Sequence, residues 1–146
     1  MHKFIILFIF FSFILAHGFT QKMPDLIVEK IETPQWKFYE SKSSAPDSSL
    51  CLVYITIKNQ GAIISKPVIL KVWDMSYDRK DKEPNICFEI KKKIPALNKN
   101  QSIRVLVTFK YWVYNPNCEL GVFIDYNNTV NEENEKNNTS VFFDAG

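Results

Sequence analysis

The chain has 146 residues with a formal net charge of +2 at pH 7, and 46% of its residues are hydrophobic. This near-neutral balance gives no electrostatic basis for binding nucleic acid or an anionic membrane surface. Once an N-terminal leader is set aside, about 125 residues remain, which suits one domain with one core.

Residues 1–20 have the composition of a secretory signal peptide. A basic start precedes an apolar run over residues 4–16, which is shorter than the roughly 20 residues of a membrane-spanning helix. Small residues follow the run and predict cleavage after Gly18 or Thr20. A retained membrane anchor is the alternative. We expect an exported protein, periplasmic or extracellular and at the cell surface, with no stable membrane insertion after cleavage.

Removal of this leader would also remove both histidines, His2 and His17, and leave a formal charge of +1. Without histidine, the exported chain cannot form a Ser-His-Asp or Cys-His nucleophile, nor a histidine metal site. The paired carboxylates that remain lie in polar connectors, where solvated surface charge is the simpler interpretation. We therefore expect a protein that is not an enzyme.

Seven short apolar runs follow the leader, separated by turn residues. They are Asp25–Glu32, Leu50–Asn59, Pro67–Met75, Ile86–Ile94, Gln101–Tyr111, Cys118–Tyr126 and Thr139–Asp144. Most alternate with a period of two or are rich in β-branched and aromatic residues, as strands are. The pattern predicts an all-β domain over residues 24–146, an immunoglobulin-like sandwich of two antiparallel sheets with about seven strands. A small barrel is the alternative.

Three of these runs alternate most clearly, and their aliphatic faces are the predicted core. The core positions are Val53, Ile55, Ile57, Ile103, Val105, Val107, Phe109, Leu120, Val122 and Ile124. Trp73 lies within another apolar run and is expected to join them. Lys91, Lys92 and Lys93 indicate an edge strand, since charge there discourages pairing with other sheets; a basic binding patch is the other interpretation.

The last connector, Asp125–Asn138, reads DYNNTVNEENEKNN and joins the final two predicted strands. Asn and Asp side chains bond nearby backbone groups and favour turns, which suggests a structural role, and Glu132 or Glu135 could tie the connector to the sandwich. The same oxygens could coordinate calcium, although the Asp-x-Asp-x-Asp-Gly spacing of a calcium loop is absent. The candidate ligands are Asp125, Asn127, Glu132, Asn134 and Glu135.

This order of an acidic residue closing a strand, then Asn, an aliphatic, Glu, Asn-Glu and Asn-Asn, resembles the end of CARDB modules of bacterial and archaeal surface proteins. Pro24-Asp25-Leu26 resembles their first strand, and Lys58-Asn59-Gln60-Gly61 resembles their Asn-x-Gly turn, where Gly can take a positive φ. Ile94-Pro95-Ala96-Leu97 also matches. Asn100 stands where the family commonly has Gly, and Asn tolerates the left-handed backbone.

The resemblance implies a non-catalytic adhesion or binding module that recognises a protein or a glycan. Two other classes remain open. One is a structural protein that assembles through an edge strand. The other is a secreted inhibitor that presents residues 40–49 or 74–85 to another protein.

Three cysteines are present: Cys51, Cys87 and Cys118. In an immunoglobulin-like sandwich the second and sixth strands run the same way in facing sheets, and Cys51 and Cys118 share the parity of the inward residues. A bridge between them is feasible and would close a loop of 66 residues (118 − 51 − 1). Pairing of Cys87 with either, or three thiols, are the alternatives.

Aromatic residues Trp36, Trp112 and Tyr114 fall at the ends of predicted strands. Aromatic rings in such places stack on sugars, anchor a partner, or cap the core. The sequence leaves these roles open.

Overall fold

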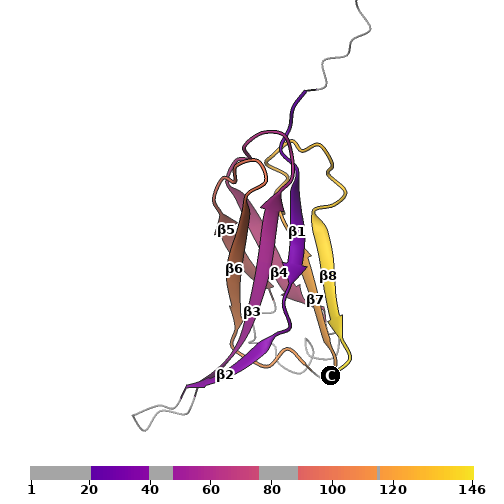
Figure 1. Ribbon diagram of the computed structural model, residues 1–146. Helices are drawn as coiled ribbons and strands as arrows, with labels where there is room; N and C mark the ends of the chain where they lie inside the picture. Colours follow the sequence, from indigo (N-terminus) through magenta and orange to yellow (C-terminus); the bar gives the residue numbers. More distant parts are fainter. Residues whose placement is uncertain (1–20, 40–47, 76–88, 115) are drawn as a thin grey trace, which may run out of the picture.

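The computed structural model describes residues 21–39, 48–75, 89–114 and 116–146. Within these ranges the chain forms eight strands and no helix. The strands are β1 (Leu26–Ile31), β2 (Gln35–Tyr39), β3 (Ser48–Asn59), β4 (Val68–Asp74), β5 (Glu89–Ile94), β6 (Ser102–Phe109), β7 (Cys118–Phe123) and β8 (Thr139–Asp144). They form two antiparallel sheets that face each other (Figure 1). The predicted sandwich is confirmed, and none of the described segments is a helix that could span a membrane.

The first sheet is organised around β3, its longest strand, with 12 residues. β6 pairs along one side of β3, whereas β1 and β2 share the other side. The ladder passes from β1 to β2 across Pro34, which has no N–H to donate and so interrupts the pairing. β2 was not among the predicted strands, because it has only five residues and directly follows this proline.

The second sheet has the strand order β5-β4-β7-β8. β5 and β8 are therefore its edges, and the prediction that the three lysines mark an edge strand is confirmed. β7 ends at Phe123, earlier than predicted, because Asp125 adopts a left-handed φ of 51° and turns the chain.

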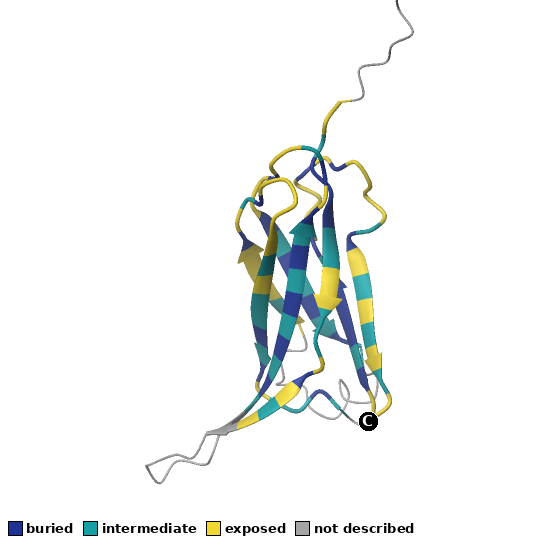
Figure 2. Ribbon diagram, in the orientation of Figure 1, coloured by how far each residue is buried: buried dark blue, intermediate teal, exposed yellow. Residues whose placement is uncertain are grey.

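The core lies between the two sheets and contains the predicted aliphatic faces (Figure 2). The residues predicted from β3 and β7 are fully buried, as are Val107 and Phe109 of β6. Ile103 and Val105 are half-buried and pack against the same cluster. The alternation of apolar residues therefore gave the correct inward face in all three strands.

The prediction that Trp73 lies in this core is wrong. Val68, Leu70 and Val72 occupy the buried positions of β4, which places Trp73 on the outward face of its sheet. Its indole covers Gly121 on β7, where an added Cβ would lie 2.3 Å from the Trp73 Cε2 atom. A glycine on the neighbouring strand thus provides the space that the indole fills.

Candidate functional site

The Asn-rich connector after β7 is held in shape by the carboxylate of Asp125, which is 1% exposed. Its Oδ1 accepts hydrogen bonds from the Thr129 backbone N–H and hydroxyl at 3.0 and 2.8 Å, and its Oδ2 accepts one from the Val130 N–H at 2.8 Å. Both carboxylate oxygens therefore serve the backbone of the turn. Val130, the aliphatic residue of the connector, is buried against the core.

Glu132 connects the same segment to the first strand of the protein. Its Oε2 accepts a hydrogen bond from the Leu26 N–H, and its Oε1 accepts one from Asn138 Nδ2 at 3.1 Å. Burial raises the pKa of Glu132 to about 7, and the charges of Glu135 and Asp125 add to the rise. The two hydrogen bonds act in the opposite direction, because they favour the ionised carboxylate.

The other candidate calcium ligands are exposed and bond locally. Glu135 Oε1 accepts a hydrogen bond from the Glu132 N–H at 2.8 Å, and Asn134 Oδ1 accepts one from the Lys136 N–H at 3.1 Å. Asn127 lies in the exposed part of the turn. Across the described ranges, no three His, Cys, Asp or Glu side chains are grouped so that they could hold a metal ion.

A second buried amide, Asn59, completes this end of the sandwich. Its Oδ1 accepts hydrogen bonds from the N–H groups of Asp25 and Gly61, both at 3.1 Å. Its Nδ2 donates to the carbonyls of Ile63 and Leu97 at 2.8 and 2.9 Å. All its hydrogen-bonding capacity is thus used within the protein, which explains how a fully buried polar residue is tolerated.

Asp25 extends this network, since Gln60 Nε2 and Asn137 Nδ2 donate to its two oxygens at 2.7 and 2.8 Å. We call the hydrogen-bonded set of Asp25, Asn59, Glu132 and Asn138 the clamp. It joins residues 24–26, the turn after β3 and the connector before β8. The residues of the clamp belong to motifs that were recognised separately in the sequence, and only the structure shows that these motifs contact one another.

Gly61 also contributes to this end, for a reason other than the predicted one. The prediction of a positive φ is wrong, because Gly61 is absent from the left-handed residues of the described chain. An added Cβ would instead lie 2.3 Å from the Asp25 nitrogen, so the glycine allows two backbones to approach closely. The left-handed backbone expected at Asn100 is confirmed, with φ of 61°.

Aromatic side chains gather at the opposite end of the sandwich. Trp36 on β2 meets Trp112 edge to face, with ring centroids 5.2 Å apart, and Trp112 stacks on Tyr114 at 4.8 Å. All three are half-buried and pack against the core. The sequence named these residues, and the structure shows that they form one group.

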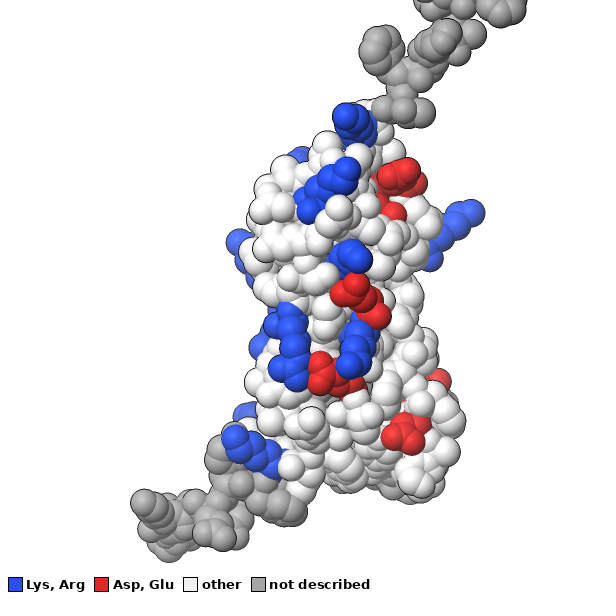
Figure 3. Space-filling model, viewed as in Figure 1, with Lys and Arg blue, Asp and Glu red and all other residues white. Residues whose placement is uncertain are grey.

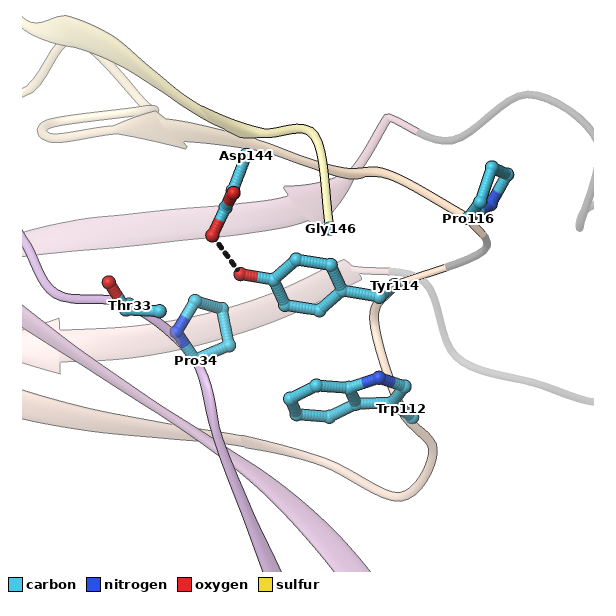
Figure 4. Close-up of a pocket in the computed structure, with 7 residues that line it drawn as sticks. All are labelled: Thr33, Pro34, Trp112, Tyr114, Pro116, Asp144 and Gly146. Carbon is cyan, nitrogen blue, oxygen red and sulfur yellow. Dashed lines mark hydrogen bonds between the residues drawn. The ribbon is translucent and has the colours of Figure 1, made fainter.

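Tyr114 also fixes the end of the last strand, because its hydroxyl donates a hydrogen bond of 2.5 Å to Asp144 Oδ2 (Figure 4). Burial, followed by this bond to a carboxylate, raises the pKa of the phenol above its usual range. The neutral phenol is therefore the form present at physiological pH.

A pocket of about 480 Å³ opens beside this pair. Aromatic rings and prolines form much of its wall, and a hydroxyl and a carboxylate supply polar groups (Figure 4). Its lining residues are Thr33, Pro34, Trp112, Tyr114, Pro116, Asp144 and Gly146. Apolar walls with a few polar groups are typical of sites for small ligands or for part of a larger one.

Cys51 and Cys118 are both fully buried at this end of the core. Cys51 pairs across the ladder with Trp36, and Cys118 pairs across the other ladder with Asp144. A bridge between them stays a prediction, and Cys87 lies outside the described residues. The same is true of most of the two loops proposed for an inhibitor.

The outward faces of the two sheets differ in character. On the first sheet, opposite charges alternate and pair, as in Lys58–Glu29 at 3.3 Å and Arg104–Glu32 at 2.7 Å (Figure 3). The second sheet is more aromatic: Lys71 Nζ lies 5.3 Å from the ring centroid of Trp73 and 4.6 Å from that of Tyr126. The first face is well solvated, whereas the second leaves apolar surface exposed.

Several solved structures have a fold similar to that of this chain. The crystal structure of the CARDB domain of a Pyrococcus furiosus protein in complex with di-metal ions is 18% identical, with a TM-score of 0.56 over 86% of this chain and 96% of that chain. A solution structure of a domain from a candidate cell surface protein of Methanosarcina acetivorans is 20% identical, with a TM-score of 0.55 over 84% and 91%. A solution structure of the Pyrococcus furiosus CARDB domain is 18% identical, with a TM-score of 0.53 over 85% of this chain and 95% of that chain.

At these identities the solved structures show a shared fold. No protein of curated function matches the chain. The family model named CARDB matches residues 23–142, which is most of the sequence. The chain therefore belongs to the CARDB family.

Proposed function

We propose that this protein is an exported, non-catalytic recognition module that binds a protein or glycan partner at its aromatic end. The observation that carries the proposal is the group formed by Trp36, Trp112 and Tyr114 beside a pocket of about 480 Å³. Flat aromatic surface next to hydrogen-bonding groups suits a sugar ring or an anchoring side chain.

The polar groups of the pocket are placed to select a partner. Asp144 keeps an acceptor at the rim even while Tyr114 donates to it, because a carboxylate has several lone pairs. Thr33 adds a hydroxyl that both donates and accepts. A sugar with adjacent hydroxyl groups would match this combination.

Two observations support binding without catalysis, and two others support a location outside the cell. Residues 21–146 contain no histidine, and the buried carboxylates of Asp125 and Glu132 hold the backbone in place. The leader-like residues 1–20 and the description of the Methanosarcina acetivorans relative as a candidate cell surface protein both support export.

The test is a glycan array probed with the exported protein, followed by calorimetric titration of any ligand found. We expect Trp112→Leu to weaken binding at least tenfold, which is about 1.4 kcal/mol. Tyr126→Leu is the matched control, because Tyr126 is an aromatic residue, 38% exposed, that does not line the pocket. Equal loss of affinity in both variants would show that the pocket is not the binding site. An array without signal would contradict a glycan ligand.

A second candidate function, calcium binding, rests on two buried amide oxygens. Asn137 Oδ1 and Asn138 Oδ1 accept no hydrogen bond from any group in the described ranges. They lie in side chains that contact Asp25 and Glu132, so oxygen ligands of the kind calcium prefers are close by. The relative solved with di-metal ions adds support.

The calcium proposal predicts a higher melting temperature with calcium than with chelator. Calcium at a hundred times its dissociation constant would add about 2.7 kcal/mol to the free energy of unfolding. Asn138→Leu should abolish the difference, whereas Asn131→Leu, at an exposed position of the same connector that is not a candidate ligand, should retain it. Identical melting temperatures with calcium and with chelator would contradict calcium binding.

A further inference from the structure

The two edges of the second sheet are protected very differently. β5 carries Lys91, Lys92 and Lys93, and a second copy pairing with it would bring like charges together. β8 reads TSVFFD and has neither lysine nor proline. Val141 and Phe143 are 53% and 62% exposed. Pairing with another strand is thus disfavoured by charge at β5, whereas β8 presents an apolar edge without such protection.

The hydrogen-bond register of β8 shows which backbone groups its free edge presents. The Ile124 N–H donates to the Asn138 carbonyl at 2.8 Å, so this position of the β7–β8 ladder is a hydrogen-bonded pair. Hydrogen-bonded and non-hydrogen-bonded pairs alternate in antiparallel ladders. The backbone groups of Thr139, Val141 and Phe143 therefore point away from β7, toward the open edge.

The neighbouring strand of the other sheet does not close this edge with a ladder. β1 lies beside β8 (Figure 1), but among the described strands β1 pairs with β3 alone. Its own ladder shifts register between Val28 and Lys30, an irregularity that disfavours further pairing on that edge.

We propose that β8 is the docking edge for a second copy of this chain, which adds its own β8 in antiparallel orientation. Opposition of Val141 to Phe143 of the second copy would place the four exposed apolar side chains in two matched pairs. Each Val141 also continues a row across its own sheet through Gly121 to Trp73, so each matched pair would adjoin the outward indole face of one copy.

Charge and symmetry favour a second copy over an unrelated partner. The outward side chains of β8 are uncharged, and antiparallel pairing keeps the two Asp144 carboxylates at opposite ends of the contact. Because the lysines protect the other edge of the same sheet, addition at β8 stops at two copies. A closed two-fold dimer is the expected product.

The test is sedimentation of the exported protein over a concentration series, with three variants. Val141→Lys/Phe143→Lys would set lysine against lysine twice, and we expect its dissociation constant to rise at least about tenfold. Val141→Lys/Phe143→Glu would set lysine against glutamate twice and restore association relative to the first variant. Ile64→Lys, also at an exposed apolar position (56%), should dimerise like the unmodified chain.

This measurement needs no bound partner, so its outcome is independent of the recognition proposed for the aromatic end. Concentration-dependent dimers that respond in the stated order would support β8 as the interface. A monomer at all concentrations, or two double variants that behave alike, would overturn the proposal.

Discussion

The Glu132 carboxylate accepts a hydrogen bond from the Leu26 backbone N–H, 106 positions earlier in the chain. Both residues are buried, so this contact fastens the first strand to the connector that precedes the last one. Removing such an acceptor leaves a buried donor without a partner, which costs more than a surface hydrogen bond contributes. The Asn- and Glu-rich connector therefore stabilises this end of the sandwich.

The raised pKa of Glu132 predicts that stability depends on pH in an unusual direction. The unfolded carboxyl titrates near 4.5, whereas burial raises the folded pKa to about 7. Between these values the folded state holds the proton more tightly, so stability is greatest below the window and decreases as pH rises through it. We expect the free energy of unfolding in urea to fall by about 2 kcal/mol between pH 4.5 and 7.5.

Glu132→Gln is the control for this prediction, since glutamine keeps the shape but does not titrate. We expect its stability to vary little across the same window. A variant curve that falls in parallel with that of the unmodified protein would show that another group causes the dependence.

The two internal glycines should respond differently to alanine. A Cβ at Gly61 would meet the backbone of Asp25 at 2.3 Å, and backbone cannot move without breaking the clamp. A Cβ at Gly121 would meet the Trp73 indole, a side chain on the outward face, which can shift toward solvent. We expect Gly61→Ala to lower the free energy of unfolding by about 3 kcal/mol and Gly121→Ala by about 1 kcal/mol. Equal losses in urea titrations would contradict the clamp.

The hydrogen bond from Tyr114 to Asp144 predicts a measurable loss when the hydroxyl is removed. Tyr114→Phe should lower the free energy of unfolding by about 1–2 kcal/mol, because the acceptor is a partly buried carboxylate. Tyr126→Phe should have little effect, since Tyr126 is more exposed. Thermal unfolding of both variants decides the matter, and an unaffected Tyr114→Phe would contradict the role given to this bond.

The cysteines provide a prediction that peptide mapping can check. Cys51 and Cys118 are buried at the same end of the core on facing sheets. In the exported protein we expect a Cys51–Cys118 disulfide, which contributes up to roughly 4 kcal/mol by restricting the unfolded chain. Mapping without reduction should recover the linked peptides. Recovery of Cys87 linked to either residue would replace this pairing.

The parts of the fold that follow from local pattern could be predicted from the sequence. Alternation identified the inward residues of β3, β6 and β7, because successive side chains in a strand point to opposite faces. Asn100 was also predicted correctly, since few residues other than glycine tolerate its φ of 61°. These features depend on neighbours along the chain.

The features that were missed depend on contacts between distant segments. Trp73 appeared to belong to the core because its strand is apolar throughout, and only the gap at Gly121 explains its outward position. β2 follows a proline and has one partner strand, so its short run carried little signal. The sequence suggested that Glu132 or Glu135 ties the connector to the sandwich, but the partner, the Leu26 N–H, follows only from the topology.

The most direct test of recognition at the aromatic end is a chemical-shift titration with the ligand found on the array. The account predicts that the indole N–H signals of Trp36 and Trp112 and the backbone amides of Thr33 and Asp144 shift together, while the connector from Asp125 to Asn138 stays unchanged. Shifts confined to the connector, with the aromatic signals unmoved, would contradict it.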